Sequence, residues 1–415
     1  MSVLHPFPGL VVHSEWAERV TTGPYDAYSP DERAALAEAN PYSFLNVTRS
    51  MEDVPEERRH DVDGLLAECA EAMDRLYDVG AYRSFEDPAL FLYRLEVDRP
   101  AGRHSQTGIM GLVPVVGDLD HRILRHEEVR PDRTELMARH LVTVGASSSP
   151  ISLAYRADAD LDAEVARCCA AEPVLVSASE GVDQVVWAVT GPDAEHLADL
   201  VGDRTLYVTD GHHRLAAAAH ALQANEDAPG PLAWTQAVLF PDQEMLVLPF
   251  HRRVGDARRR SPGDLLEALR TVGSIEERDS AEAARPDLPG RVGVYLGGRW
   301  YSLVLPEAAG DRAVDLLDVA RLQDGVLGPV FGIIDPGRDP MIDYVPDPAG
   351  LDALVGRCDE DGRVGFVTHP LSVTELMAVA DAGELMPPKS SYFEPKPRSG
   401  VFLRRLDREV NSGAV

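Results

Sequence analysis

The residues with the clearest chemical potential are Asp210, Gly211, His212, His213 and Arg214, which follow one another in the run TLYVTDGHHRLAAAAHAL. A glycine lets the backbone approach a ligand closely, and an arginine presents a fork of N–H donors to phosphate oxygens. The free N–H groups at the start of a helix also favour anions. The cluster therefore indicates an anion-handling site.

A strand and a helix must position this cluster. Residues 205–209 are rich in β-branched side chains and alternate in polarity, which predicts a short strand. Residues 215–222 are almost pure alanine and leucine, which predicts a helix. A simpler interpretation stays open at this point, in which Asp210 is only the N-cap of a helix with a solvated basic first turn.

Three further polar clusters occur elsewhere. His126, Glu127 and Glu128 precede a helix predicted to start near Pro131, and residues 387–396 form a proline-bounded loop, PPKSSYFEPK. Each has a structural alternative, an acidic helix start for the first and a rigid turn for the second. The third, His251 with Arg252 and Arg253, stands at the end of a predicted strand and could equally be a solvated strand end.

Composition narrows the classes of function. The chain has 415 residues and a net charge of −29, which argues against a nucleic-acid-binding surface but permits a small anion in a local basic pocket. No apolar run approaches the ~20 residues of a membrane span. The four cysteines are poorly spaced for disulfides, and no convincing signal peptide is present, so we expect a cytoplasmic protein. Of the 40 basic residues only Lys389 and Lys396 are lysine, and both lie in the proline-bounded loop.

The pattern of elements predicts an α/β (α+β) protein. Residues 89–99 and 103–116 read as a β-hairpin and residues 43–49 as a strand. We predict an N-terminal α+β region over 1–99, a nucleotide- or phosphate-binding core over 100–255, and a C-terminal α+β domain over 256–415 that contributes the Lys389 loop.

Together the clusters suit phosphoryl transfer, which needs donors for phosphate oxygens and carboxylates for Mg²⁺ and for the acceptor's proton. Neither the Walker A sequence nor the protein-kinase motifs are present. The candidate donors are Gly211, His212, His213, Arg214, Lys389, Ser390 and Ser391, and the candidate carboxylates are Asp210, Glu127 and Glu128.

The order of HEEV, helix, SPISL strand and YVTDGHHRLAAAA resembles the ParB-like and sulfiredoxin-like fold and, within it, the free-serine kinases. Those kinases also carry a late GE-x-x-x-PK-[ST]-[ST] segment, and this chain reads GELMPPKSS from Gly383. The resemblance implies a ParB/sulfiredoxin-like core, with Glu127 as the base for the acceptor hydroxyl and the Asp210–Arg214 turn handling nucleotide phosphates and acceptor.

Nearly the whole chain also resembles the bacterial domain-of-unknown-function family 1015. The marks of that family are a PPYD-like start, here GPYD from Gly23, the HE and DGHHR motifs, LPFHR from Leu248 to Arg252, and MPPKSSYF with serine in place of threonine. This second resemblance places the chain in a family but implies little about function.

The leading hypothesis is a kinase that transfers a phosphoryl group from ATP or ADP to the hydroxyl of free serine or a related hydroxy amino acid. The catalytic residues would be Glu127, Asp210 and His212, with Asp210 also binding Mg²⁺. Phosphate binding would involve Gly211, His213, Arg214, Lys389, Ser390 and Ser391. Substrate binding would involve His126, Glu128, His251, Arg252 and Tyr392.

Two other classes of function remain open. A ParB-like protein could bind a nucleotide as a conformational switch without transferring phosphate. A metal-dependent hydrolase could be built on His126, His212, His213 and His251, although adjacent histidines seldom ligate one metal. The expected partners are therefore a nucleotide and a small-molecule hydroxyl acceptor, with neither nucleic acid nor membrane, and the sequence leaves the oligomeric state open.

Overall fold

The structure is a computed structural model that describes residues 2–100, 102–115, 122–147, 149–225 and 230–406. The chain divides into two compact units, which are described separately. Unit 1 comprises Met1–Leu124, Val129–Met245 and Pro395–Val415, and unit 2 comprises Arg125–Glu128 and Leu246–Glu394. Both units combine helices with sheets, which confirms the predicted α+β class. The ParB/sulfiredoxin-like identity of the core and the three predicted domain ranges stay predictions.

Unit 1 is built on an eight-stranded mixed sheet. In spatial order its strands are β5 (Ile123–Leu124), β10 (Leu206–Asp210), β7 (Ile151–Tyr155), β11 (Trp234–Pro241), β4 (Gly102–Pro114), β3 (Ala89–Arg99), β9 (Val182–Thr190) and β8 (Leu175–Ser179). The β3–β4 pair is the predicted hairpin, with Phe91 opposite Met110 and Arg99 opposite Gly102. A four-stranded sheet accompanies it, in the order β2 (Tyr82–Ser84), β1 (Leu10–Val12), β20 (Phe402–Arg405) and β6 (Ala146–Ser147).

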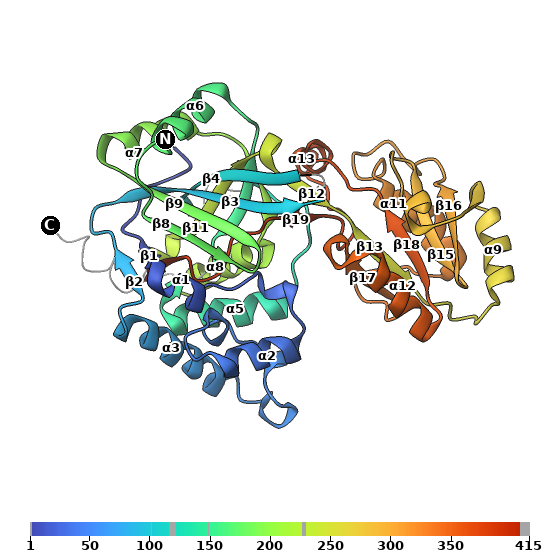
Figure 1. Cartoon of the computed structure of the whole chain (residues 1–415), viewed down its shortest axis with the longest axis horizontal. Helices are drawn as coiled ribbons and strands as arrows, with labels where there is room; N and C mark the ends of the chain where they lie inside the picture. The colour runs from blue at the N-terminus through green and yellow to red at the C-terminus, as the bar shows by residue number, and fades with distance from the viewer. Residues whose placement is uncertain (1, 101, 116–121, 148, 226–229, 407–415) are drawn as a thin grey trace. The chain divides into compact units, whose positions relative to one another are not determined.

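Alternation along the strands gives the large sheet two apolar faces. Leu90 and Leu92 of β3 point to one face, where they join a core with α6 (Ala159–Cys168) and α7 (Gly191–Val201). Phe91 and Tyr93 point to the other face and join a core with α3 (Val62–Asp78). Figure 1 shows α6 and α7 on the opposite side of the sheet from α3. Among the described residues, the remaining helices of unit 1 are α1 (Ser14–Val20), α2 (Pro30–Ala39), α5 (Pro131–Val144) and α8 (His212–Ala224), with 3₁₀ turns Tyr25–Ala27, Phe44–Asn46, Met51–Asp53, Glu56–Arg58, Pro231–Ala233 and Asp242–Glu244.

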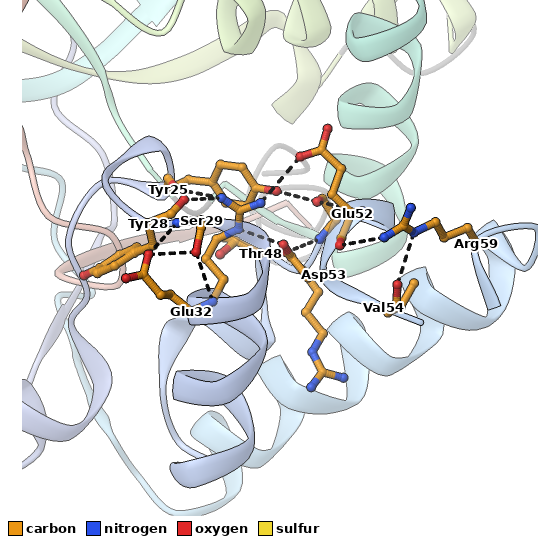
Figure 2. Close-up of polar contacts among 12 residues, drawn as sticks. Tyr25, Tyr28, Ser29, Glu32, Thr48, Glu52, Asp53, Val54 and Arg59 are labelled. Atoms are coloured by element: carbon orange, nitrogen blue, oxygen red, sulfur yellow. Dashed lines mark hydrogen bonds and ion pairs between the residues drawn. The ribbon is translucent and has the colours of Figure 1, made fainter. Parts of the chain in front are cut away.

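A polar network around Arg33 fixes the N-terminal part of unit 1. The Arg33 Nε donates to Asp53 Oδ1 at 2.7 Å, and the guanidinium lies 3.7 Å from the centroid of the Tyr25 ring. Ser29 and Glu32 form the capping box of α2, which Figure 2 shows beside Tyr25 and Asp53. The sequence around the PPYD-like start therefore serves local folding, because its aromatic ring and backbone carbonyls hold a buried arginine.

The strand predicted over residues 43–49 is wrong. Residues Phe44–Asn46 form a 3₁₀ turn whose N-cap is Ser43. The Asn46 side-chain amide donates to the carbonyl oxygens of Ala37, Asn40 and Ser43, at 3.0, 2.9 and 3.3 Å. These side-chain hydrogen bonds close the chain into a turn, although its residue types favour a strand.

Unit 2 is built on a six-stranded sheet. Its order is β14 (Ile275–Arg278), β16 (Arg299–Val304), β15 (Arg291–Leu296), β18 (Val364–Thr368), β13 (Phe250–Val254) and β17 (Ile342–Pro346), and β12 (Leu246–Leu248) pairs separately with β19 (Tyr392–Glu394). The α-helices are α9 (Pro262–Arg270), α10 (Ala281–Ala284), α11 (Asp318–Leu322), α12 (Gly350–Asp361) and α13 (Val373–Asp381), with a π-helix over Gln323–Phe331 and a 3₁₀ turn over Asp347–Ala349.

The two faces of this sheet also carry separate cores. Val294 and Phe366 pack with residues of α9 and the π-helix, whereas the adjacent Tyr295 and Val367 pack with residues of α12. Successive residues of each strand therefore face different surroundings. No helix in the described part of the chain is both long and apolar enough to cross a membrane.

Buried histidines should make the protein acid-sensitive. Burial lowers the pKa of His104, His140 and His251 below the ordinary value of 6.5. A lowered folded-state pKa means that the unfolded chain binds protons first, so the stabilisation is complete above pH 6.5 and is lost as the pH falls toward the folded-state value. His140, whose Nε2 lies 2.6 Å from the Val47 carbonyl oxygen, is the best one to test.

We expect the free energy of unfolding, measured by urea titration, to fall between pH 7 and pH 5. The His140→Gln variant keeps an N–H donor but cannot titrate, so its decline over this range should be shallower. His196 is exposed on the surface of α7, so the His196→Gln variant serves as the control. Equal slopes for wild type and His140→Gln would contradict the assignment.

Candidate functional site

The strand and helix predicted around the central motif are both present. Strand β10 ends at Asp210, and α8 begins at His212. Gly211 joins them in the left-handed region, at φ +96°, and is the N-cap residue of α8. The Asp210 side chain does not cap the helix, so the simpler interpretation of this residue as an N-cap is wrong.

The Asp210 carboxylate instead lies between two cations. Its Oδ1 is 3.0 Å from Lys396 Nζ, and its Oδ2 accepts a hydrogen bond from Arg214 Nη2. Burial opposes ionisation of this carboxyl group, but Lys396 and Arg214 outweigh it and lower the pKa of Asp210 to about 2. Two positive charges and one negative charge leave a net positive charge at the N-terminal end of α8, where the helix dipole adds to it.

Further contacts fix the positions of these side chains. Arg214 Nη1 donates to the Pro150 carbonyl oxygen at 2.8 Å, in the residue before β7. The segment that carries Lys396 is held by Gln106, whose Nε2 donates to the Pro395 carbonyl oxygen at 2.8 Å. Arg214 and Asp210 side chains remain 27% and 25% exposed, so a dissolved ligand can reach them.

Lys396 is the functional candidate that sequence reasoning missed. It lay within the proline-bounded loop, but only Lys389, Ser390, Ser391 and Tyr392 were assigned a role there. Its side chain is 8% exposed and paired with Asp210, whereas Lys389 belongs to unit 2 and is exposed. The sequence did carry a signal for Lys396, because every basic residue of the chain other than Lys389 and Lys396 is arginine.

The two histidines of the motif differ in their surroundings. His212 is buried, at 4% exposed. The Nε2 of His213 accepts a hydrogen bond from the Arg130 backbone N–H at 3.1 Å, at the N-cap of α5. While Nε2 accepts this hydrogen bond, it cannot donate to a phosphate. The contact instead links the start of α8 to the start of α5.

Unit 2 brings two of the three further clusters together. The Met386 backbone N–H donates to the His126 carbonyl oxygen at 2.8 Å, so the HEE and GELMPPKSS segments are neighbours. Glu127 is partly exposed and Glu128 exposed, whereas His126 is buried. The roles predicted for these residues stay predictions.

The late segment has its own internal structure. Ser390 Oγ donates to the Pro387 carbonyl oxygen at 2.6 Å, and Glu384 Oε2 accepts from the Val314 N–H at 2.9 Å. Lys389 has a positive φ of +54° and its Nζ lies 5.0 Å from the centroid of the Phe250 ring. Tyr392 also packs on this ring, edge to face, at 5.5 Å. Ser391, beside it, is partly exposed.

The conformation of Gly211 gives a direct test of the turn. A Cβ at this position would lie 3.0 Å from Arg214 Nε and Nη2 and 3.0 Å from Ile151 Cγ2, in a backbone region that costs other residues about 1–2 kcal/mol. The Gly211→Ala variant should therefore lose about that much free energy of unfolding and displace Arg214 from Asp210.

The matched control is Gly356→Ala, at an exposed position of α12, where an added Cβ meets nothing within 4 Å. This change should raise the free energy of unfolding by about 0.5–1 kcal/mol. Urea unfolding measures both effects. Equal stability of the two alanine variants would show that the turn does not need glycine.

Comparison with known proteins identifies the family. Residues 4–320 match the model of the family described as "Protein of unknown function (DUF1015)", and the chain belongs to this family. The resemblance drawn from the GPYD, DGHHR and LPFHR motifs is thereby confirmed. No curated protein matches the chain.

Several solved structures show a remote similarity. Free serine kinase in complex with AMP is 15% identical, with a TM-score of 0.36 over 72% of this chain and 93% of that chain. A conserved hypothetical protein from Pyrococcus furiosus is 14% identical, with a TM-score of 0.35 over 72% and 97%. SbnI with a C-terminal truncation, from Staphylococcus aureus, is 14% identical, with a TM-score of 0.37 over 69% and 84%.

Proposed function

We propose that this protein is a phosphotransferase that moves a phosphoryl group from ATP or ADP to the hydroxyl of a small molecule, with free L-serine or a related hydroxy amino acid as the acceptor. The observation that carries the proposal is the pairing of Asp210 with both Arg214 and Lys396 at the start of α8. The motif order HEE, DGHHR and GELMPPKSS supports it.

The cluster suits nucleotide phosphates for three reasons. Gly211 has no side chain to block an approach to the first N–H groups of α8. Arg214 offers a planar fork to phosphate oxygens, and Lys396 offers a compact charge. Asp210 holds both cations in place before the ligand arrives, which reduces the ordering that binding must impose.

In the proposed reaction the acceptor hydroxyl oxygen forms a bond to the terminal phosphorus of the nucleotide. The bond from that phosphorus to the bridging oxygen breaks, and the nucleotide leaves with the electron pair, while the hydroxyl proton passes to a carboxylate, the role that the sequence resemblance implies for Glu127. Arg214 and Lys396 would stabilise the charge on the phosphate oxygens.

Magnesium is the expected companion of the nucleotide. Asp210 was predicted to bind it, but both Asp210 oxygens are in ion pairs. Across the described ranges, the structure contains no group of three or more His, Cys, Asp or Glu side chains arranged to hold a metal ion. Mg²⁺ would therefore be held chiefly by the phosphates and water, as is common for this ion.

The test is a product panel. The protein is incubated with ATP or ADP, Mg²⁺ and L-serine, L-threonine, L-homoserine or D-glycerate, and products are identified by mass spectrometry. A phosphorylated acceptor that is absent without protein is the expected result. If no acceptor on the panel is phosphorylated with either nucleotide, the proposed activity is wrong.

A nucleotide-binding switch is the second candidate. It is favoured by the fact that the one carboxylate in the cluster, Asp210, is neutralised by two cations and is poorly suited to act as a base. In that case ADP or ATP should raise the melting temperature of the protein, and no phosphorylated acceptor should be detected.

A further inference from the structure

Arg252 and Arg253 are adjacent in β13 and equally buried, at 3% and 4% exposed, yet they have opposite surroundings. Arg253 faces acidic side chains. Its Nη2 donates to Asp361 and, at 2.7 Å, to the Arg357 carbonyl oxygen, and its Nη1 lies 3.4 Å from Asp343 Oδ1. Its charge is compensated within unit 2.

Arg252 has no such compensation. Within the described part of the chain its side chain makes one hydrogen bond, from Nη1 to the Phe250 carbonyl oxygen, and no carboxylate lies within ion-pair distance. Its other contact is with the Tyr344 ring, whose centroid is 5.6 Å from Cζ. Burial lowers the pKa of Arg252 to about 10, which still leaves the guanidinium charged at neutral pH.

An unpaired buried cation costs folding free energy, because it loses water without gaining a counter-charge. The cost is the more notable in a chain with 69 acidic and 40 basic residues, where a carboxylate partner would be easy to supply. Natural proteins tolerate such groups where function needs them. The missing counter-charge is therefore best supplied by a ligand.

A second cation lies at the same phenylalanine. Lys389 Nζ is 5.0 Å from the centroid of the Phe250 ring, while Arg252 bonds to the carbonyl oxygen of that residue. Lys389 is also one of three non-glycine residues with positive φ in the described chain, a strained conformation that marks functional positions more often than ordinary ones. Arg252, Lys389 and Phe250 all belong to unit 2.

We propose that Arg252, assisted by Lys389, binds the carboxylate of a small molecule. The planar fork of a guanidinium matches the two oxygens of a carboxylate. A singly charged carboxylate also balances the single buried charge of Arg252, since Lys389 is exposed and its charge is solvated. That this carboxylate belongs to the hydroxyl acceptor rests on the proposed function, and it makes the acceptor a hydroxy acid or hydroxy amino acid.

The experiment measures binding to the full chain without nucleotide, by calorimetry and by melting temperature. The probes are L-serine and D-glycerate, which carry a carboxylate, L-serinamide, which lacks one, and inorganic phosphate. We expect a carboxylate probe to bind the wild type and the Arg252→Met variant to bind it about 10- to 100-fold more weakly, the loss expected for charge-assisted hydrogen bonds. Binding of serinamide should be weak in both proteins.

Stability supplies a second readout and a matched control. Without ligand, Arg252→Met should melt at the wild-type temperature or above it, because an uncompensated charge is removed. Arg253→Met should melt at a lower temperature, because Asp361 and Asp343 lose their partner, and Arg253→Lys should keep the carboxylate affinity. A structural role for Arg252 would instead lower the melting temperature of Arg252→Met and leave the affinity unchanged.

The outcomes separate this inference from the proposed function. Carboxylate binding that depends on Arg252 supports the inference even if the product panel is empty. It is overturned if neither carboxylate probe binds the wild type, if phosphate binds in their place, or if Arg252→Met phosphorylates serine with an unchanged KM.

Discussion

Replacing Lys396 by methionine should weaken the binding of ADP by about 10- to 100-fold, the loss expected for one charge-assisted contact to a phosphate. The substitution removes the ion pair to Asp210 at 3.0 Å and leaves that carboxylate to Arg214 alone. The cluster then has no net positive charge. Isothermal titration calorimetry with ADP measures the effect directly.

Lys396→Arg is the matched control for this first prediction. It keeps the charge but replaces a compact ammonium by a broad planar group, so part of the affinity should return. The pKa of Asp210 should rise in Lys396→Met and much less in Lys396→Arg. Unchanged ADP affinity in Lys396→Met would remove Lys396 from the nucleotide site.

The second large effect concerns Glu127. In the proposed reaction this carboxylate accepts the acceptor's proton, and loss of a general base typically lowers kcat by about 10²- to 10⁴-fold. Glu127→Gln keeps the size and hydrogen-bonding capacity of the side chain but removes the basic oxygen. We therefore expect kcat for the phosphorylated acceptor to fall by this amount while the dissociation constant of ADP is unchanged.

The control is Glu135→Gln, at an exposed position of α5, which should leave kcat and ADP affinity at wild-type values. The pH profile adds a test that a structural role would not satisfy, because the acidic limb of the kcat profile should disappear in Glu127→Gln. A Glu127→Gln enzyme with wild-type kcat would refute the base assignment.

Local features of the sequence predicted local features of the structure. The β10–Gly211–α8 turn was predictable because a β-branched run, a glycine and an alanine-rich run are each decisive over a few residues. The strand pair β3–β4 was predictable for the same reason. The 3₁₀ turn at Phe44–Asn46 was not, because the Asn46 hydrogen bonds that stabilise it outweigh the strand preference of the segment.

Long-range contacts were much harder to predict. The motif order indicated that DGHHR and the lysine loop were related, but spacing could not say which lysine pairs with Asp210. That choice depends on how the segment after β19 is held, and Gln106 from β4 contributes to this through the Pro395 carbonyl oxygen. The difference between Arg252 and Arg253 could not be predicted from the sequence either. It arises because the two side chains lie on opposite faces of β13 and acidic residues lie only on the face of Arg253.

The most direct test of the account is a crystal structure of the full chain with ADP bound. We predict that the terminal phosphate lies within hydrogen-bond distance of Lys396 Nζ and of a backbone N–H at the start of α8, and that Arg214 contacts the phosphates of the same ADP molecule. An ADP molecule bound elsewhere, with Asp210, Arg214 and Lys396 still paired only with one another, would contradict it.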